Sequence, residues 1–239
     1  MEQPGISLTQ TLPPFLKEIN RQLGKRSVDR ILKLAVGHFR DDIALTTAFG
    51  ASGMVLLHHV LKIKPDIRVH FIDTGYHFPE TLEFAGMIQK KWHLNLTITR
   101  PSGRDKELGP EPYVADPDRC CAINKVEPLL SFIYEQSAWL SAIRRDQSQT
   151  RKHLRLVEID RRGTIKISPL INWSHREIWR YIHTHKIPVN PLFAKGYSSI
   201  GCAPCTVKVG AEGHERDGRW QKSSKLECGL HDHLPHASD

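Results

Sequence analysis

The chain alternates short apolar runs with amphipathic segments, and this order constrains its fold more than any other feature of the sequence. The apolar runs predict buried strands at residues 43–49, 67–72, 94–98 and 138–143. Apolar residues at helical spacing predict helices at residues 27–40, 54–63, 79–92, 125–135 and 174–185. Strands that alternate with helices form mostly parallel sheets covered on both faces. The sequence therefore predicts an α/β domain of this kind.

Local signals mark several of the element ends. Pro79 stands at a first helical position, and Ser174 with Glu177 forms a capping box that opens the last predicted helix. Residues 50–53 predict a tight loop, and residues 161–163 predict the turn of a short hairpin. After Pro188, glycines, prolines and charged residues replace the apolar periodicity. That change predicts site-forming loops followed by a mobile tail.

Composition narrows the class of protein and the kind of partner. The 239 residues, 39% of them hydrophobic, suit one globular domain. The formal net charge of +8 indicates an anionic partner, which is either nucleic acid or a small phosphorylated or sulfated substrate. No apolar run approaches the ~18 residues that cross a bilayer, and the first ten residues do not resemble a secretion signal. We therefore expect a cytoplasmic protein with no membrane partner.

The loops after the predicted strands carry the first candidate ligand-binding residues. In an open α/β sheet, ligands bind beyond the carboxyl ends of the strands, where helix N-termini favour anions. The candidates in these loops are Phe49, Gly50, Asp73, Thr74, Gly75, Arg144 and Arg151. Each loop alone is a weak signal, because such residues also form ordinary turns, and the arginines also suit a solvated basic loop.

Five cysteines form the more specific signal. Cys202 and Cys205 have the C-x-x-C spacing that lets two thiolates reach one metal or form a redox pair, and Cys120-Cys121 supplies two more candidate ligands. Four thiolates suit either zinc or an iron–sulfur cluster, and the adjacent pair favours a cluster because neighbouring side chains diverge. The alternative is a pair of small core residues and a separate redox pair.

The fifth cysteine, Cys228, is left over from any even pairing. Arg216 and Arg219 precede it and His231 follows it. Because thiolates are favoured near cations, these residues predict a redox nucleophile that acts on an anionic substrate. An unreactive surface cysteine is the alternative.

Six ordered motifs together resemble one enzyme family. They are Cys120-Cys121, KVEPL at 125–129, RRDQS at 144–148, GYSSIGCAPCT at 196–206, GRW at 218–220 and ECGLH at 227–231. From about residue 42 to residue 231 the chain is similar to the assimilatory, thioredoxin-dependent adenylyl-sulfate (APS) reductases of the PAPS/APS reductase family. PAPS is the 3′-phosphorylated form of APS.

The resemblance implies a fold and a cofactor. The implied fold is the adenine-nucleotide α-hydrolase-like fold, related to the ATP pyrophosphatases, with the nucleotide over the carboxyl edge of a mostly parallel sheet. The implied cofactor is one [4Fe–4S] cluster per subunit, bound by Cys120, Cys121, Cys202 and Cys205. The corresponding division is an N-terminal extension at 1–26, a nucleotide-binding α/β reductase domain with the cluster at 27–205, and a tail with the catalytic cysteine at 206–239.

The resemblance also implies an activity. Cys228 attacks the sulfur of the substrate's sulfate group, AMP leaves, and thioredoxin or glutaredoxin releases sulfite from the resulting cysteine S-sulfonate. The residues that match phosphosulfate contacts in the family are Lys125, Arg216, Arg219 and His231. This chemistry belongs to sulfate assimilation and cysteine biosynthesis. No nucleic-acid partner is expected, and a homo-oligomer is left open.

Two departures from the family pattern and three rival functions qualify the resemblance. Asn124 stands where the family usually has an arginine, and residues 51–53 replace acidic residues of many relatives. The chain also lacks the S-G-G-x-D-S signature of ATP pyrophosphatases, which argues against ATP cleavage. The rivals are a reductase of PAPS or of both substrates, a tRNA-modifying thiol enzyme, and a zinc-stabilised nucleic-acid-binding module.

Overall fold

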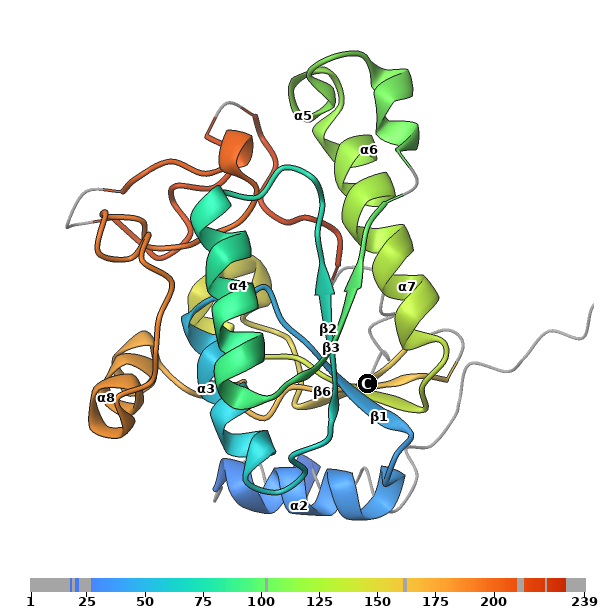
Figure 1. The fold of residues 1–239 in the computed structure, drawn as a ribbon, viewed down its shortest axis with the longest axis vertical. Coiled ribbons are helices and arrows are strands. Elements are labelled where there is room, and N and C mark those ends of the chain that lie inside the picture. Colours follow the sequence, from blue (N-terminus) through green and yellow to red (C-terminus); the bar gives the residue numbers. More distant parts are fainter. Residues whose placement is uncertain are drawn as a thin grey trace, which may run out of the picture.

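A six-stranded sheet forms the centre of the molecule in the computed structural model, which describes residues 18, 20, 21, 27–101, 103–160, 163–209, 213–221 and 223–230. The strand order is β3-β2-β1-β4-β6-β5, and neighbouring strands are parallel except for the antiparallel pair β5 and β6 (Figure 1). The strands are β1 (Ile43–Thr46), β2 (Arg68–Ile72), β3 (Asn95–Thr99), β4 (Ala138–Leu140), β5 (Val157–Ile159) and β6 (Ile165–Ile167).

Helices cover both faces of this sheet. In Figure 1, α3 and α4 lie on one side of the strands and α7 lies on the other, while α2 crosses the end of the molecule opposite the C-terminal loops. The α-helices are α2 (Val28–Phe39), α3 (Ala51–Leu61), α4 (Pro79–Trp92), α5 (Pro112–Ala115), α6 (Pro117–Cys121), α7 (Glu127–Ile133) and α8 (His175–His185). This arrangement confirms the predicted parallel sheet between two helical layers.

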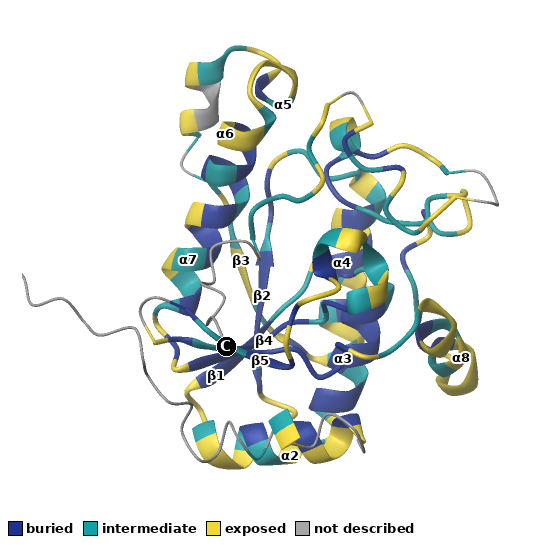
Figure 2. Cartoon of the chain, turned by 180° about the vertical axis from the view of Figure 1, so that it is seen from behind, coloured by how far each residue is buried: buried dark blue, intermediate teal, exposed yellow. Residues whose placement is uncertain are grey.

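The core lies where the central strands meet α3. Ile43, Ala44 and Leu45 of β1 are fully buried, because helices cover both faces of this central strand. Figure 2 shows that the central strands are buried, whereas the edge strand β3 is partly exposed. Ile98 of β3 remains 48% exposed. The continuous apolar runs in the sequence therefore mark the inner strands.

Several predicted element ends were wrong, and most of the errors lie at the carboxyl edge of the sheet. The strand predicted at 43–49 ends at Thr46, and the strand predicted at 138–143 ends at Leu140. Their apolar continuations leave the hydrogen-bonded ladder and form loops above it. Residues 51–53 are the first turn of α3, with Gly50 as its N-cap, instead of a tight loop. The predicted helix 125–135 is also part of a longer run, in which α6 continues through the π-helical turn η3 (Ala122–Val126) into α7.

Other local predictions are confirmed. The Ser174–Glu177 capping box is present in full at the start of α8, and Pro79 occupies the first turn of α4. β5 and β6 form the predicted hairpin, although residues 161 and 162 of its turn lie outside the described residues. Among the described residues after Pro188, regular structure is limited to the 3₁₀ turn η6 (Ala203–Cys205) and two isolated bridges.

No helix in the described part of the chain combines the length and the apolar character needed to cross a membrane.

Candidate active site

A cavity lies at the carboxyl edge of the sheet, where the order of the strands reverses. From β1 the chain adds β2 and β3 on one side and then crosses to β4 on the other. Such a reversal opens a crevice between neighbouring loops, which is where open α/β sheets bind ligands. A cavity of about 270 Å³ occupies this position, lined by the ends of β1, β2 and β4, the start of α8 and the C-terminal segment.

The loop after β1 presents backbone to the cavity. Gly50 lines the cavity and caps α3 without a side-chain hydrogen bond, so the positive end of this 11-residue helix faces the space. Phe49 has a left-handed backbone (φ 55°), and its ring turns into the core, 5.3 Å from the ring of Phe71. Of the two residues predicted here, the structure brings Gly50 to the cavity and places the Phe49 side chain beneath it.

The loop after β2 presents one of its three predicted residues to the cavity. Thr74 lines the cavity, and its hydroxyl lies 3.3 Å from the sulfur of Cys202. The Asp73 carboxylate instead accepts hydrogen bonds from the Gly75 amide (3.1 Å) and from Arg100 (3.0 Å). Asp73 and Gly75 therefore do not line the cavity and instead shape the turn that holds Thr74 there.

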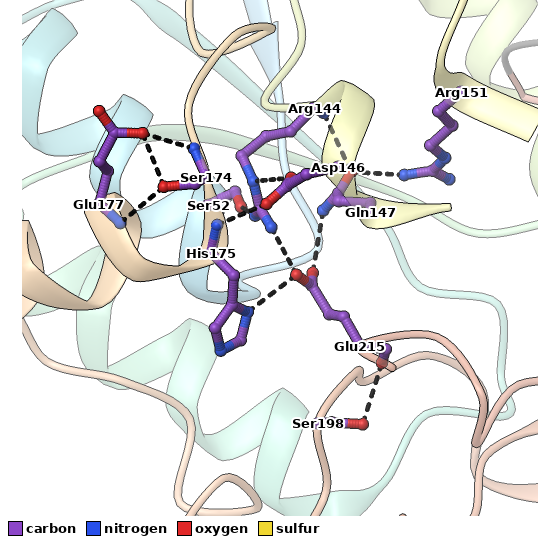
Figure 3. A network of polar contacts seen from close by, with 10 residues as sticks. All are labelled: Ser52, Arg144, Asp146, Gln147, Arg151, Ser174, His175, Glu177, Ser198 and Glu215. Carbon is purple, nitrogen blue, oxygen red and sulfur yellow. Dashed lines mark hydrogen bonds and ion pairs between the residues drawn. The ribbon is translucent and has the colours of Figure 1, made fainter. Parts of the chain in front are cut away.

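Arg144, in the loop after β4, is 1% exposed and is surrounded by hydrogen-bond acceptors (Figure 3). Its guanidinium donates hydrogen bonds to Ser52, to Asp146 at 2.8 Å and to Glu215 of the C-terminal segment. These contacts tie the start of α3 and the C-terminal segment to the β4 loop. The positive charge of Arg144 is consequently compensated inside the cavity wall.

Glu215 collects donors from three parts of the chain. Besides Arg144, Gln147 donates to its carboxylate at 3.1 Å, and the ring Nδ1 of His175 at the start of α8 lies 3.0 Å away (Figure 3). Burial alone would raise the pKa of Glu215, but His175, Arg144 and Gln147 outweigh burial and lower this pKa to about 2. Glu215 is therefore an anion at neutral pH.

Arg151 is neutralised in a similar way by Glu227. Its guanidinium makes a two-point contact with the Glu227 carboxylate, at 2.8 Å from Nε and 2.7 Å from Nη2. Its Nη1 donates to Gln147 at 2.6 Å. Both predicted arginines of the β4 loop thus line the cavity, and both are already paired with glutamates of the C-terminal segment.

The remaining predicted cations, Lys125, Arg216 and Arg219, also line the cavity. The guanidinium groups of Arg216 and Arg219 both stack on Trp220. The centre of its ring is 4.4 Å from Cζ of Arg219 and 5.5 Å from Cζ of Arg216. Arg219 lies over Gly201, where a Cβ atom would collide with its guanidinium. Arg216 contacts Glu227 at 3.0 Å, and its pKa falls to about 10 because of burial and the nearby Arg151 charge.

Two cations are left for an anionic ligand. In the described part of the chain, Lys125 and Arg219 pair with no carboxylate, in contrast to Arg144, Arg151 and Arg216. Burial alone would lower the pKa of Lys125, but the sulfurs of Cys202 and Cys228 outweigh burial and raise it. Lys125 is therefore charged, and the site contains positive charge suited to an anion.

Cys228 lines the same cavity as these cations. The thiol is free and partly buried. The structure thus brings a potential nucleophile from the C-terminal segment to the carboxyl edge of the sheet. His231, the fourth residue predicted to contact the substrate, lies outside the described residues.

The other four cysteines meet at a second, smaller cavity. Cys120 and Cys121 at the end of α6 line it together with Cys202 and Cys205, which flank the turn η6. Lys125 lines both cavities, because the π-helical turn η3 carries it between them. Among the described residues, no three Cys, His, Asp or Glu side chains are arranged to hold a single metal ion.

Comparisons with known proteins agree with this architecture. The profile of the phosphoadenosine phosphosulfate reductase domain matches residues 42–208. The chain belongs to this PAPS reductase family. The adenosine 5′-phosphosulfate reductase of Bacillus mycoides is 41% identical over 207 residues, which cover 84% of this chain and 88% of that protein. The predicted family is therefore confirmed.

Solved structures confirm the fold of this PAPS reductase family member. The phosphate complex of PAPS reductase from Candida auris superposes with a TM-score of 0.72 at 31% identity, and covers 83% of this chain and 99% of that chain. The yeast FAD synthetase in complex with FAD has a TM-score of 0.57 at 17% identity, with 84% of this chain and 71% of that chain covered. The latter likeness concerns the fold alone, and it supports the predicted adenine-nucleotide α-hydrolase-like class.

The acidic residues of the site were not predicted from the sequence. Glu215 and Glu227 stand directly before Arg216 and Cys228, so the motifs around those residues contained the only available signal. Gln147 belongs to the RRDQS motif, and His175 follows the capping serine of α8. A carboxylate in a candidate anion-binding site is not expected from charge alone. The hydrogen-bond partners of these glutamates can be identified only in the folded structure.

Proposed function

We propose that this chain is an adenylyl-sulfate reductase, which converts adenosine 5′-phosphosulfate (APS) to sulfite and AMP in sulfate assimilation and cysteine biosynthesis. The observation that carries the proposal is that the Cys228 thiol lines one cavity with Lys125 and Arg219, in the crevice where sheets of this type bind nucleotides. The names of the curated relatives support APS as the substrate.

The first step is attack by the Cys228 thiolate on the sulfur of the sulfate group. A sulfur–sulfur bond forms, the bond from sulfur to the bridging oxygen breaks, and its electron pair leaves with AMP. The enzyme then carries a cysteine S-sulfonate. Lys125 and Arg219 face the negative charge of the phosphosulfate and of the attacking thiolate, and Arg216 adds a third positive group. We expect His231 to contact the same group.

Thioredoxin supplies the electrons in the second step. One of its thiolates attacks the sulfur of Cys228, sulfite leaves with the bonding pair, and a mixed disulfide forms. The second thioredoxin thiol resolves this disulfide and restores the Cys228 thiol. The two electrons that reduce the sulfate sulfur therefore come from one dithiol, and a glutaredoxin is the alternative donor. The cytoplasm, where thiols are kept reduced, suits this chemistry.

We further propose that Cys120, Cys121, Cys202 and Cys205 hold one [4Fe–4S] cluster per subunit. These residues fit such a group because four thiols from two distant segments line one cavity. Asn124 donates to the sulfur of Cys120 at 3.6 Å, and its buried Oδ1 has no partner. When bound, the cluster would join α6 to the 202–205 turn and place a polarisable charge beside Lys125.

A bound cluster would change the ionisation of the four thiols. Burial raises the pKa of Cys120 and Cys205, and it raises that of Cys121 to about 11. For Cys202, burial is outweighed by Lys125, Thr74 and Arg219, which together lower the pKa. Metal coordination deprotonates cysteine outright and would therefore offset the effect of burial at the other three positions.

PAPS is the alternative substrate, because the Candida auris relative is named for it. The two substrates differ by a 3′-phosphate. We expect a higher kcat/KM for APS than for PAPS with the same thioredoxin. The reverse order of kcat/KM would assign the chain to the PAPS reductases.

The deciding experiment uses anaerobically purified protein, APS and no reductant, followed by the mass of the intact chain. We expect one added sulfonate on Cys228, absent in Cys228→Ser, and sulfite release when reduced thioredoxin is added. Absence of the adduct, or an adduct that persists in Cys228→Ser, would refute the mechanism. Iron and sulfide analysis of the same sample tests the cluster, and a protein that contains zinc without iron would contradict it.

A further inference from the structure

Glu227, the residue directly before the proposed nucleophile, is the most completely bound carboxylate of the site. Ser148 and Thr150 donate to Oε1 at 3.1 and 2.8 Å, and Arg151 donates to both oxygens at 2.8 and 2.7 Å. Arg216 donates to Oε2 at 3.0 Å. The Glu227 side chain is only 8% exposed. These five contacts outnumber the roughly four lone-pair sites of one carboxylate, so none is left for the substrate.

The donors come from two separate segments, so Glu227 joins them. Ser148, Thr150 and Arg151 belong to the loop after β4, whereas Arg216 precedes Glu227 in the C-terminal segment. Burial would raise the pKa of Glu227, but the hydrogen bonds and charge of Arg151 and the charge of Arg216 lower it to about 2. The contact is therefore a permanent ionic one at neutral pH, with a planar two-point geometry that fixes direction.

A second contact holds the chain on the other side of Cys228. Leu230 packs against the apolar cluster of Leu129, Ile133 and Trp139. Between the two, Gly229 has a left-handed backbone (φ 83°), a conformation that residues with side chains rarely adopt. Cys228 is thus held between an ionic contact at Glu227 and an apolar contact at Leu230, and it lines the cavity from there.

We infer that Glu227 is a positioning residue for the proposed reaction, acting through Arg151 and Arg216 to hold the Cys228 thiol against the bound phosphosulfate. The same carboxylate directs the guanidinium of Arg216, which also donates to the Leu226 carbonyl at 3.2 Å. Glu227 does not touch the reacting atoms, so its effect falls on the rate of thiol attack more than on nucleotide binding. This inference rests on the proposed function.

The test compares Glu227→Gln and Glu227→Asp with the wild type. Glutamine keeps the size of the side chain but removes the charge, and aspartate keeps the charge on a shorter arm. The matched control is Glu158→Gln, because Glu158 of β5 is 9% exposed and pairs with the buried Lys166, and neither residue lines the cavity. The measurements are the single-turnover rate of adduct formation at saturating APS, the dissociation constant of AMP, and Tm.

We expect Glu227→Gln to slow adduct formation by about 30-fold or more, because a displaced nucleophile loses its alignment, while AMP affinity stays within about threefold. Glu227→Asp should recover part of the rate. Glu158→Gln should change neither quantity by more than about threefold, whatever its effect on Tm. Equal rates in wild type and Glu227→Gln, or a parallel loss of rate and AMP affinity, would overturn the inference.

A readout without substrate separates this inference from the proposed function. Iodoacetamide labelling of Cys228, located by peptide mass, should be at least about tenfold faster in Glu227→Gln, because the thiol is no longer held in the cavity. If the wild type forms no adduct with APS, the proposed function fails while the labelling comparison still tests positioning. Unchanged labelling in Glu227→Gln would overturn the positioning role even if APS reduction is established.

Discussion

The region from α2 to α8 and the C-terminal segment after Pro188 are ordered by different forces. The first has a six-stranded ladder and an apolar core in which β1 is fully buried. The described residues of the second have one 3₁₀ turn and two isolated bridges. Ion pairs with the first region contribute to holding the segment, and they include Arg144–Glu215, Arg151–Glu227, Lys225–Asp118 and Lys195–Glu80.

This difference shows how the two regions divide the parts of the candidate site. The sheet region supplies a fixed crevice with a helix N-terminus, Lys125 and two buried arginines. The C-terminal segment supplies the proposed nucleophile Cys228, two further arginines and the glutamates that compensate the buried arginines. Docking of the segment therefore completes both the chemistry and the charge balance of the cavity.

Loss of the proposed nucleophile Cys228 should produce the largest effect on activity and should separate the contributions of the two regions most clearly. Cys228→Ser should lower the rate of APS reduction by roughly 10⁴-fold or more, because the hydroxyl is a far weaker nucleophile than a thiolate. The sheet region should be unaffected, so Tm should stay within about 2 °C of the wild type. Steady-state sulfite release and thermal unfolding measure the two quantities. A large fall in Tm would show that the segment also stabilises the sheet region.

A core substitution should lower stability and leave activity almost unchanged. Leu45→Ala in β1 removes a fully buried side chain and should lower the free energy of unfolding by about 3 kcal/mol. Activity per folded molecule should change little, because Leu45 does not line the cavity. Urea unfolding measures the loss, with Ile98→Ala on the exposed edge strand as the control, expected within about 0.5 kcal/mol. Equal losses in the two variants would contradict the assignment of the core.

Acid should loosen the C-terminal segment through Glu215. Its pKa is 4.5 in the unfolded reference and about 2 in the folded protein, so the carboxylate stabilises the folded state above pH 4.5. This contribution, about 3 kcal/mol, is lost as pH falls from about 4.5 to about 2. In Glu215→Gln we expect lower stability than wild type at pH 7 and convergence of the two curves near pH 2. Parallel curves across this range would rule out the buried Arg144–Glu215 pair.

A glycine of the C-terminal segment should tune the site without affecting the core. In Gly201→Ala, the new methyl group would occupy the space of the Arg219 guanidinium and displace it from the cavity. If Arg219 binds the substrate as proposed, kcat/KM should fall by between roughly 10- and 100-fold. Gly86→Ala in α4 is the matched control, since a Cβ there meets nothing within 4 Å, and its activity should be unchanged. Equal kcat/KM for the two variants would exclude Arg219 from substrate binding.

The smallest expected effect is on stability, and it comes from the N-terminal cap of α8. Ser174→Ala removes the hydroxyl that accepts from the Glu177 amide at the start of α8, and should cost about 1 kcal/mol of stability. Ser174→Asn keeps a capping acceptor and should retain most of the stability. Activity per folded molecule should be unchanged, unless a shift of α8 moves His175 away from Glu215. Hydrogen exchange in α8 and chemical unfolding check this prediction.

The sequence predicted much of the fold but less of the site. The strand positions, the two helical layers and the capping box at Ser174 follow from local patterns, which depend on neighbouring residues alone. The strand ends at Thr46 and Leu140 did not follow, because the apolar residues beyond them leave the ladder to line a cavity. The orientation of Phe49 into the core depends on Phe71 and Phe84, which no local pattern reveals.

The sequence by itself determined the α/β class, the family and the types of reactive groups, because alternating periodicity and ordered motifs are properties of the linear chain. Only the tertiary structure decided which charges oppose one another. Glu215 and Glu227 compensate Arg144 and Arg151 across 71 and 76 positions of sequence, whereas Lys125 and Arg219 pair with no carboxylate of the described residues. Coulomb energy and desolvation depend on distance and burial, and these arise when separate segments pack together.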